Sequence, residues 1–462
     1  MLTSRAVDRI LRLPSLIGLA ALIVVLLAGC SGISPSSSTG GHATAPARPS
    51  SPGAVVADCL TYQPRCYTPM QVRVAYGIQP LLDRGITGRG QTIVLPEFPP
   101  SPTGSRSALV KMLASSDIRL DLARFDTLFG LPVARLQVVN TLAHAASPWQ
   151  ADAEEVADTE IVHALAPDAA IRLVLVPSSD TAGPGPESDA FLAALRLGLT
   201  LGGVISLSAD AGEQCFTSAE VAEWNSFLQA AQSKHVTVLV SSGDAGAAID
   251  PCPGAGTTAS PVKGVNLPAS DPLALAVGGT SLQLSQRAGA YKGETAWNIP
   301  SAAVGGSSPE ASGGGFSQLF PRPAYQDGVT GMGATRGVPD VAADADPGTG
   351  MALAISDGGQ GHILIGAGGT SAAAPLWAAV IALADQYARR DLGFVNPALY
   401  RIGHSAYYRQ AFHDVTTGSN TVTFPTQTIT GYHAAPGWDR VTGWGSPNAQ
   451  ALVPLLARYA SP

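Results

Sequence analysis

From Gln91 onward the sequence alternates between short apolar runs and longer amphipathic segments, and this order constrains the fold more than any other feature. The short runs have the length and the β-branched content of buried strands, at 92–95, 171–176, 204–207, 236–240, 273–277 and 351–355. The longer segments follow the helical period, at 105–113, 153–166, 188–199, 218–234 and 371–390. Apolar strands alternating with helices predict an α/β fold with a mainly parallel central sheet and helices on both faces.

The first thirty residues have the pattern of an export signal. A basic arm with three arginines precedes an apolar stretch at 17–27, which is short for a membrane span. The stretch ends in Leu-Ala-Gly-Cys at Cys30, which resembles a bacterial lipobox, whose cysteine thiol receives diacylglycerol. We therefore expect residues 1–30 to be a lipoprotein-type signal peptide, with an ordinary signal peptide and an uncleaved anchor helix as alternatives.

Residues 31–58 are rich in Ser, Pro, Gly and Ala, which is typical of a flexible tether. With lipid on Cys30, the folded part is expected outside the cytoplasm, anchored to the membrane of a bacterium, or else secreted. Charged residues make up 13% of the chain and the net charge is -7, which gives no electrostatic footprint for nucleic acid. We expect no nucleic-acid partner, and a monomer.

Four cysteines remain when Cys30 is assigned to lipid, and an even number in an exported chain favours disulfides. Cys59 and Cys66 are close enough to close a small loop, and Cys215 and Cys252 are the remaining pair. A zinc site is disfavoured because no pair has the short spacing of a zinc knuckle.

A serine before a long helical run is the candidate nucleophile. Ser371 follows Gly-Gly-Thr and precedes Ala-Ala-Ala-Pro, so it lies at or just before a helix N-terminus, whose unpaired N–H groups favour a neighbouring oxyanion. Pro375 is expected early in this helix, where its missing N–H costs least. The same four letters end at Ser281, but strand-like residues flank them and no helix follows, so Ser281 is expected to be structural. The alternative for Ser371 is a plain capping serine.

A serine hydroxyl needs a neighbour that takes its proton. Subtilisin-like enzymes use a histidine in His-Gly-Thr, a sequence that does not occur in this chain. Glu154 and Asp158 lie four residues apart, so on a helix both carboxylates share one face, which Ile161 and Leu165 continue inward. Carboxylates held together away from water repel, so the pKa of one rises and they tend to share a proton.

Such a pair can accept a proton at acidic pH, where an imidazole would already be charged. Taken alone, an acidic pair at this spacing is more often a solvated helix face, and the neighbouring Glu155 and Glu160 could be surface charges.

Several motifs together resemble the sedolisin, or serine-carboxyl peptidase, family over roughly residues 67–456. Glu154 and Asp158 match the family's Glu-x-x-x-Asp pair, and Ser371 matches its nucleophile. The remaining matches are Tyr-Thr-Pro at 67–69, Ala-Tyr-Gly-Ile at 75–78, Gly-Ile-Thr-Gly-Arg-Gly-Gln at 85–91, Ala-Leu-Ala-Pro at 164–167 and Ser-Ser-Gly-Asp at 241–244.

The resemblance implies a subtilisin-like fold and a peptidase domain over residues 59–462. It also makes Asp244 the residue that faces the oxyanion, with the Ser371 N–H as second donor. Asp244 follows a predicted strand at its carboxyl end, and a protonated carboxyl there can donate to an oxyanion at low pH. As an isolated residue it would more often be a turn aspartate.

The resemblance also implies one structural calcium ion near the C-terminus. Two aspartates and three main-chain carbonyls would supply the oxygen ligands that calcium prefers. These residues are Asp414, Val415, Ala435, Gly437 and Asp439, with Ala435 where the family often has glycine.

Two departures from the family pattern stand out, and one further family residue is retained. Family members generally carry a large N-terminal pro-segment, whereas only the tether precedes Cys59 here, so we expect the chain to fold without one, with a separate helper, or under different regulation. Around the family's Ser-x-Ser-aromatic-Gly pattern, Ala209 replaces the aromatic residue that supports the acidic pair. Glu97 is the candidate for the outer glutamate partner of that pair.

The sequence therefore predicts a serine-type peptidase that cleaves proteins or peptides, with an acidic pH optimum. Glu154 takes the Ser371 proton, Asp158 shares its charge, and Asp244 binds the oxyanion. The alternative is a catalytically silent cell-surface binding protein that keeps the fold. An esterase is disfavoured, because Ser371 lacks the Gly-x-Ser-x-Gly elbow.

Overall fold

A computed structural model describes residues 66–97, 117–141, 153–176, 187–209, 211–249, 251–252, 260–285, 289–300, 308–356 and 362–460. The predicted signal peptide, Cys30, the tether and the predicted helix at 105–113 lie outside these ranges. No helix within them is long and apolar enough to cross a membrane.

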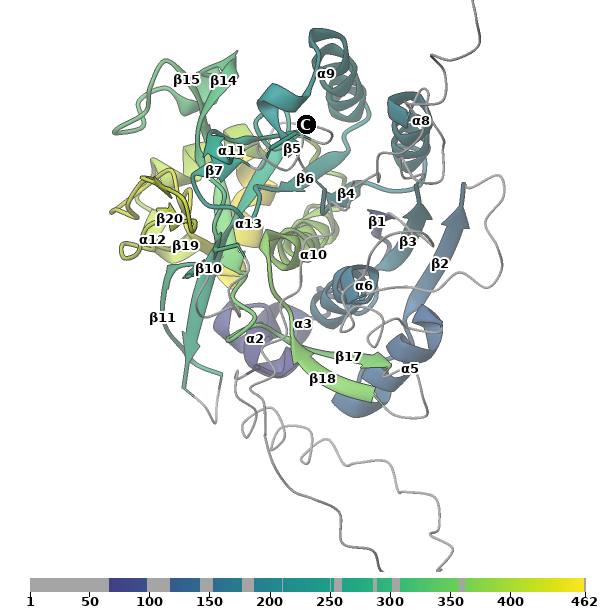
Figure 1. The fold of residues 1–462 in the computed structure, drawn as a ribbon. Coiled ribbons are helices and arrows are strands. Elements are labelled where there is room, and N and C mark those ends of the chain that lie inside the picture. The colour runs from purple at the N-terminus through teal and green to yellow at the C-terminus, as the bar shows by residue number, and fades with distance from the viewer. Residues whose placement is uncertain are drawn as a thin grey trace, which may run out of the picture.

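The core is an eight-stranded sheet, parallel except for one edge (Figure 1). The strand order is β11-β10-β6-β4-β1-β3-β2, β16 also pairs with β10, and only the β10–β11 pair is antiparallel. The strands are β1 (Thr92–Glu97), β2 (Arg135–Asn140), β3 (Ala170–Leu175), β4 (Val204–Leu207), β6 (Thr237–Ser241), β10 (Leu275–Leu284), β11 (Tyr291–Ala296) and β16 (Val341–Asp344).

Helices cover both faces of this sheet, as predicted, because side chains of each strand alternate between two apolar cores. Ile93 and Leu95 of β1 face the larger core, whereas Val94 faces the smaller one. The larger core includes α2 (Pro69–Ala75), α3 (Gln79–Leu82), α5 (Ile118–Phe129), α6 (Ala153–Leu165), α10 (Thr370–Ala388), α11 (Asn396–Gly403) and α13 (Ala449–Tyr459). The smaller core lies under α8 (Glu187–Gly198) and α9 (Ser218–Ser233), on the other side of the sheet in Figure 1.

Short elements decorate this framework. The two-stranded sheets are β5–β9 (Ala211–Gly212, Asn266–Leu267), β7–β8 (Ala248–Ile249, Val262–Lys263), β12–β13 (Asn298–Ile299, Glu310–Ala311), β14–β15 (Gly315–Pro321, Thr335–Val338), β17–β18 (Ala352–Ser356, His362–Gly366), β19–β22 (Phe412–His413, Ser446–Pro447) and β20–β21 (Val422–Thr423, Thr428–Ile429). The short helices are η1 (Glu213–Cys215), η2 (Ala324–Gln326) and α12 (Tyr408–Ala411).

Most predicted elements form close to their expected bounds, with two differences. The run at 351–355 is strand β17, but it pairs with β18 outside the central sheet. The run at 273–277 is the start of the longer strand β10, which continues through the Gly-Gly-Thr-Ser sequence to Leu284. Both glycines pair with β16, and this pairing compensates for their poor strand propensity.

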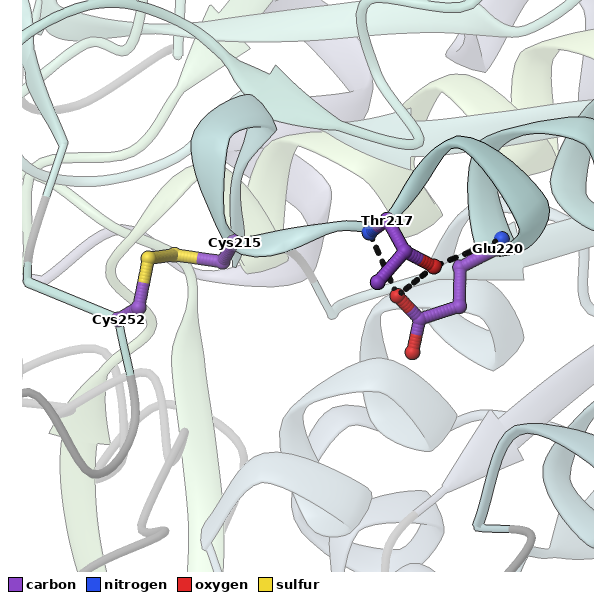
Figure 2. Close-up of a disulfide and its surroundings, with 4 residues drawn as sticks. All are labelled: Cys215, Thr217, Glu220 and Cys252. Atoms are coloured by element: carbon purple, nitrogen blue, oxygen red, sulfur yellow. Dashed lines mark hydrogen bonds between the residues drawn. A yellow bond between two sulfur atoms is a disulfide. The ribbon is translucent and has the colours of Figure 1, made fainter.

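A disulfide joins Cys215 to Cys252, as predicted (Figure 2). It lies just before α9, whose first turn is closed by a capping box between Thr217 and Glu220. Cys66 is buried, and its predicted partner Cys59 lies outside the described residues.

Candidate active site

Ser371 is the second residue of α10, a helix that crosses the larger core and is buried from Thr370 to Asp385. Gly369 caps this helix with φ +80°. A Cβ on Gly369 would lie 2.7 Å from the Asp244 Oδ2 atom, so both the backbone angle and the space require glycine. The candidate nucleophile therefore lies in the first turn of a helix, and the glycine that leads into this helix packs against the Asp244 carboxyl.

Asp244 lies in the loop that follows β6, and its carboxyl contacts the first turn of α10. Its Oδ1 atom accepts hydrogen bonds from the Thr370 N–H at 2.8 Å and from the Thr370 hydroxyl at 2.7 Å. Burial raises the pKa of Asp244, and the two Thr370 bonds offset part of that rise. The structure thus places a carboxyl of raised pKa beside the residue that precedes Ser371.

The predicted acidic pair lies on α6, which packs directly against α10. Asp158 is fully buried and Glu154, one turn earlier on the same face, is half-buried. Glu155 and Glu160, which could have been surface charges, are both buried, and Glu160 accepts the Ala354 N–H at 2.9 Å. The helix is covered on all sides, so its periodicity could not show which acidic residues point to solvent.

Ser208 connects Asp158 to the main chain of Ser371. Its hydroxyl donates to Asp158 Oδ2 at 2.8 Å and lies 3.4 Å from the Ser371 carbonyl oxygen. One hydroxyl proton cannot serve both acceptors fully, and the shorter distance assigns it to the carboxylate. The sequence pattern around Ala209 includes Ser208 but does not reveal this bridge.

Pro375 explains why the Ser371 carbonyl is accessible to Ser208. The sequence predicted that Pro375 falls where its missing N–H costs least, but it is the sixth residue of α10. At that position an ordinary residue would donate its N–H to the carbonyl four residues earlier, which is that of Ser371. The prediction was wrong because only the first four N–H groups of a helix lack a carbonyl partner, and Pro375 lies beyond them whether the helix begins at Thr370 or at Ser371.

Glu97, at the end of β1, completes the buried carboxyl group beside Asp158. Burial raises the pKa of Glu97 well above its usual value, and the charges of Asp158, Glu155 and Glu154 raise it further. Burial also raises the pKa of Asp158, to about 7, while hydrogen bonds from Glu97 and Ser208 hold it lower than burial alone would. Glu97 therefore keeps the proton and donates it to Asp158, so the two carboxyls behave as a coupled pair.

Ala209 occupies the place where the family pattern has an aromatic residue. Its methyl group is half-buried and packs against the core under α8 and α9. The Asp158 carboxyl is nevertheless fully buried, so the sheet and the two helices exclude water from it without an aromatic side chain at 209.

Two acidic residues near Asp244 were not identified from the sequence. Burial raises the pKa of Glu310 to about 8, and the charges of Asp244 and Asp346 contribute. Asp346 accepts a hydrogen bond from the Ser281 hydroxyl at 2.6 Å. Ser281, which lies inside strand β10, is therefore held by a hydrogen bond to Asp346, as expected for a structural serine in the second copy of the four-letter sequence.

The five predicted calcium ligands lie on two neighbouring loops. Asp439 accepts the N–H groups of Ala435, Val441 and Thr442 at 2.7–3.0 Å, and Asp414 accepts the Gly437 N–H at 3.1 Å. In the described part of the chain, no main-chain N–H is bonded to the carbonyl oxygens of Val415, Ala435 or Gly437.

Oxygen atoms without hydrogen-bond donors, next to two carboxylates, fit the donor set of a hard cation. Ala435 does not have the positive φ that would require glycine, so alanine is compatible with this loop. Among the described residues, no three His, Cys, Asp or Glu side chains form a metal-binding group, so any cation here depends on main-chain oxygens.

The chain is similar in sequence to two curated peptidases. It is 32% identical to "Kumamolisin" of Bacillus sp. (strain MN-32) over 411 residues, covering 86% of this chain and 65% of the relative. It is 37% identical to "Sedolisin" of Pseudomonas sp. (strain 101) over 210 residues, covering 46% of this chain and 33% of the relative. Thus the chain spans less than two thirds of the length of these relatives.

A solved structure agrees with these sequence similarities. Pseudomonas sedolisin, described as a serine-carboxyl proteinase and solved with two molecules of pseudo-iodotyrostatin, matches 86% of this chain and 99% of its own. The TM-score is 0.67 and the sequence identity is 25%. No family model matches the chain.

Proposed function

The chain belongs to the sedolisin family of serine-carboxyl peptidases, and we propose that it is itself a peptidase that hydrolyses peptide bonds in proteins or peptides at acidic pH. The observation that carries this proposal is the convergence of Asp158, Ser208 and Asp244 on the first turn of α10, where Ser371 lies. A carboxylate that accepts the serine proton and a group that binds the oxyanion are the two groups that acyl transfer by a serine requires.

In the proposed mechanism, Glu154 accepts the hydroxyl proton as Ser371 attacks the peptide carbonyl. Asp158 shares the negative charge and the proton of the acidic pair with Glu154 before the transfer, and its bond from Ser208 holds its carboxyl group in place. Glu97 is a positioning residue, because its proton lies against Asp158 and not against substrate.

Asp244 acts in its protonated form. A raised pKa keeps the proton on Asp244 at acidic pH, so that its carboxyl can donate to the oxyanion together with the Ser371 N–H. Glu154 returns its proton to the leaving amine, and the acyl-enzyme that remains is hydrolysed by water. The reaction then balances with one water consumed for each peptide bond broken.

We further propose that Asp414, Val415, Ala435, Gly437 and Asp439 hold one calcium ion. Their oxygen atoms, including three carbonyls without main-chain donors, support this assignment. A cation held by these residues would link the two loops that carry them, and would thereby add to the stability of the fold.

The location of the protein remains the sequence-based proposal: an extracytoplasmic monomer with lipid on Cys30. The disulfide between Cys215 and Cys252 supports an oxidising compartment. Incorporation of labelled palmitate into the wild-type protein, and its loss in Cys30→Ala, tests the anchor.

A quenched fluorogenic peptide assay from pH 3 to 7 tests the peptidase proposal. Ser371→Ala should lose nearly all activity, whereas Ser281→Ala is the matched control and should keep it, because the same four-letter sequence there lies in a strand. Equal rates for wild type and Ser371→Ala would favour the silent binding protein. Mass spectrometry of the products from one digested protein separates endopeptidase from tripeptidyl-peptidase cleavage.

A further inference from the structure

A cavity of about 290 Å³ lies outside the group of residues proposed for catalysis. It is formed by β8, β14 and the segment that follows β21. Its lining residues are Lys263, Gly264, Gly315, Phe316, Gln318 and Tyr432.

Two cations share the aromatic wall of this cavity. The Lys263 ammonium lies 4.4 Å from the centre of the Tyr432 ring, and the Arg440 guanidinium lies 5.0 Å from the same centre. Arg440 is also 4.9 Å from the ring centre of Phe316, which meets Tyr432 edge to face. These cation–π contacts hold both positive charges near the cavity without cancelling them.

Neither cation has a carboxylate partner within the part of the chain that the structure describes. Lys263 donates to the Thr430 carbonyl at 2.7 Å and Arg440 donates to the Gly331 carbonyl at 2.8 Å, and both acceptors are neutral. The Arg440 Nε atom is buried and has no partner among the described residues. Two uncompensated positive charges, in a chain of net charge -7, make the cavity complementary to an anion.

The shape of the cavity suits an amphipathic side chain. Gly315 has φ +157°, and a Cβ there would lie 3.2 Å from the Tyr432 ring, so glycine keeps this wall clear. The rings of Phe316 and Tyr432 offer apolar surface to methylene groups, and the exposed Gln318 side chain carries a neutral donor.

Main-chain hydrogen bonds connect the cavity to the loop that begins at Asp244. Gly264 donates to the Ala247 carbonyl at 3.1 Å, and Gly314 donates to the Gly246 carbonyl at 3.3 Å. The path runs from Asp244 to Gly246, across the hydrogen bond to Gly314, and on to Gly315 in the cavity wall. Consecutive Cα atoms are about 3.8 Å apart, so the cavity lies within roughly 20 Å of Asp244. An extended peptide rises about 3.3 Å per residue, so a substrate reaches the cavity within roughly six residues of the cleaved bond.

We propose that this cavity is an accessory subsite that binds the carboxylate side chain of a polypeptide substrate. The inference rests on the proposed peptidase function and adds a substrate class, which is peptides with Asp or Glu within about six residues of the cleaved bond. Lys263 and Arg440 supply the positive charge, and the two aromatic rings pack against the side-chain methylenes.

Internally quenched peptides that carry either Glu or Gln at these distances, on each side of the cleaved bond, test the subsite. At pH 6 a free Glu side chain is ionised, because its ordinary pKa is about 4.3. We expect a lower KM for the Glu peptide, and Lys263→Gln or Arg440→Gln should each raise that KM roughly two- to fivefold. Lys263→Glu should reverse the preference towards a peptide with Lys at the same place. The exposed Lys292 of β11 provides the control variant Lys292→Gln, which should change neither value.

The outcomes separate this inference from the peptidase proposal. If the wild type cleaves the Glu and Gln peptides with equal KM, the subsite is wrong and the peptidase function stands. If no peptide is cleaved, the peptidase proposal fails, and anisotropy measures the binding of both peptides to the Ser371→Ala protein. The subsite proposal would then be overturned if the Glu and Gln peptides bound with equal affinity. It would also be overturned if Lys263→Gln left the affinity for the Glu peptide unchanged. Lys263 is exposed, so its variants remain informative if Arg440→Gln does not fold.

Discussion

Replacing Asp158 by asparagine tests the electrostatics of the buried carboxyls directly, because asparagine has the shape of the protonated side chain and cannot ionise. Burial raises the pKa of Asp158 from 3.8 to about 7. An acid with a raised pKa binds more protons in the folded state than in the unfolded state. Its contribution to stability is therefore complete below about pH 4 and is lost as the pH rises through about 7.

The magnitude follows from the linkage between pKa and stability. One pKa unit corresponds to about 1.36 kcal/mol, so the rise at Asp158 corresponds to at most about 4 kcal/mol between pH 4 and pH 8. Asp158 shares a proton with Glu97, so part of this dependence belongs to the pair. The unfolding free energy of Asp158→Asn, relative to that of its parent, should therefore rise by about 2 to 4 kcal/mol between pH 4 and pH 8, with most of the rise above pH 5.

Urea unfolding, followed by tryptophan fluorescence at one-unit pH steps from 4 to 8, measures this difference. Parent and variant should both carry Ser371→Ala, which prevents self-digestion during the proposed peptidase's unfolding. A difference between the two proteins that stays constant from pH 4 to 8 would refute the buried, coupled carboxyl pair.

Asp168→Asn is a control of opposite sign. Hydrogen bonds from Thr87 and Arg89 lower the pKa of Asp168, and burial offsets them only in part. The contribution of Asp168 to folding stability is present above about pH 4 and is lost as the pH falls below that value. Asp168→Asn should therefore be less stable than its parent by a constant amount above about pH 5, and this difference should shrink only as the pH falls below about 4, whereas Asp158→Asn should gain stability relative to its parent between pH 4 and pH 8.

Three further perturbations probe other parts of the molecule. Replacing both Cys215 and Cys252 by serine should cost about 4 kcal/mol of unfolding free energy, because the disulfide closes a 37-residue separation; an unchanged urea midpoint would contradict this. Asp340→Asn should cost about 3 to 5 kcal/mol, because it leaves the fully buried Arg336 without its countercharge at 2.6 Å; thermal melting that shifts by less than a degree would be inconsistent with that burial. Removing calcium with EGTA should lower the Tm, and free calcium at 100 times its Kd should restore about 2.7 kcal/mol, whereas identical melting curves with and without the ion would exclude the site.

Much of the sheet and several of its covering helices could be predicted from the sequence, because the inner strands carry dense apolar runs. The four residues of β4 were predicted with their observed bounds, since Val204, Ile205 and Leu207 form an apolar run between Gly203 and Ser208. Strand β2 was missed, because Arg135–Asn140 is an edge strand with mixed burial and no continuous apolar run. The full length of β10 was missed for a related reason, since the two glycines inside it have little strand propensity of their own.

The candidate site was predictable only where a motif carried it. Spacing alone placed Glu154 and Asp158 on one helix face, but it could not show that Glu155 and Glu160 are buried as well. That burial depends on α5, α10 and β17 packing around α6, which are contacts between distant parts of the chain. The bridge through Ser208 depends on tertiary contact too, because Asp158, Ser208 and Ser371 meet only in the folded sheet.

Helix α10 has a consequence for the timing of synthesis. It packs against α6, α13 and five strands of the central sheet, yet its residues come after all eight of those strands in the chain. A growing polypeptide that ends before Thr370 already contains the acidic pair and the Asp244 loop, but no serine for them to act on and no central helix to fold around. For the peptidase proposed above, this order of elements delays hydrolytic competence until most of the protein has been made, so that unfinished copies cannot cleave one another.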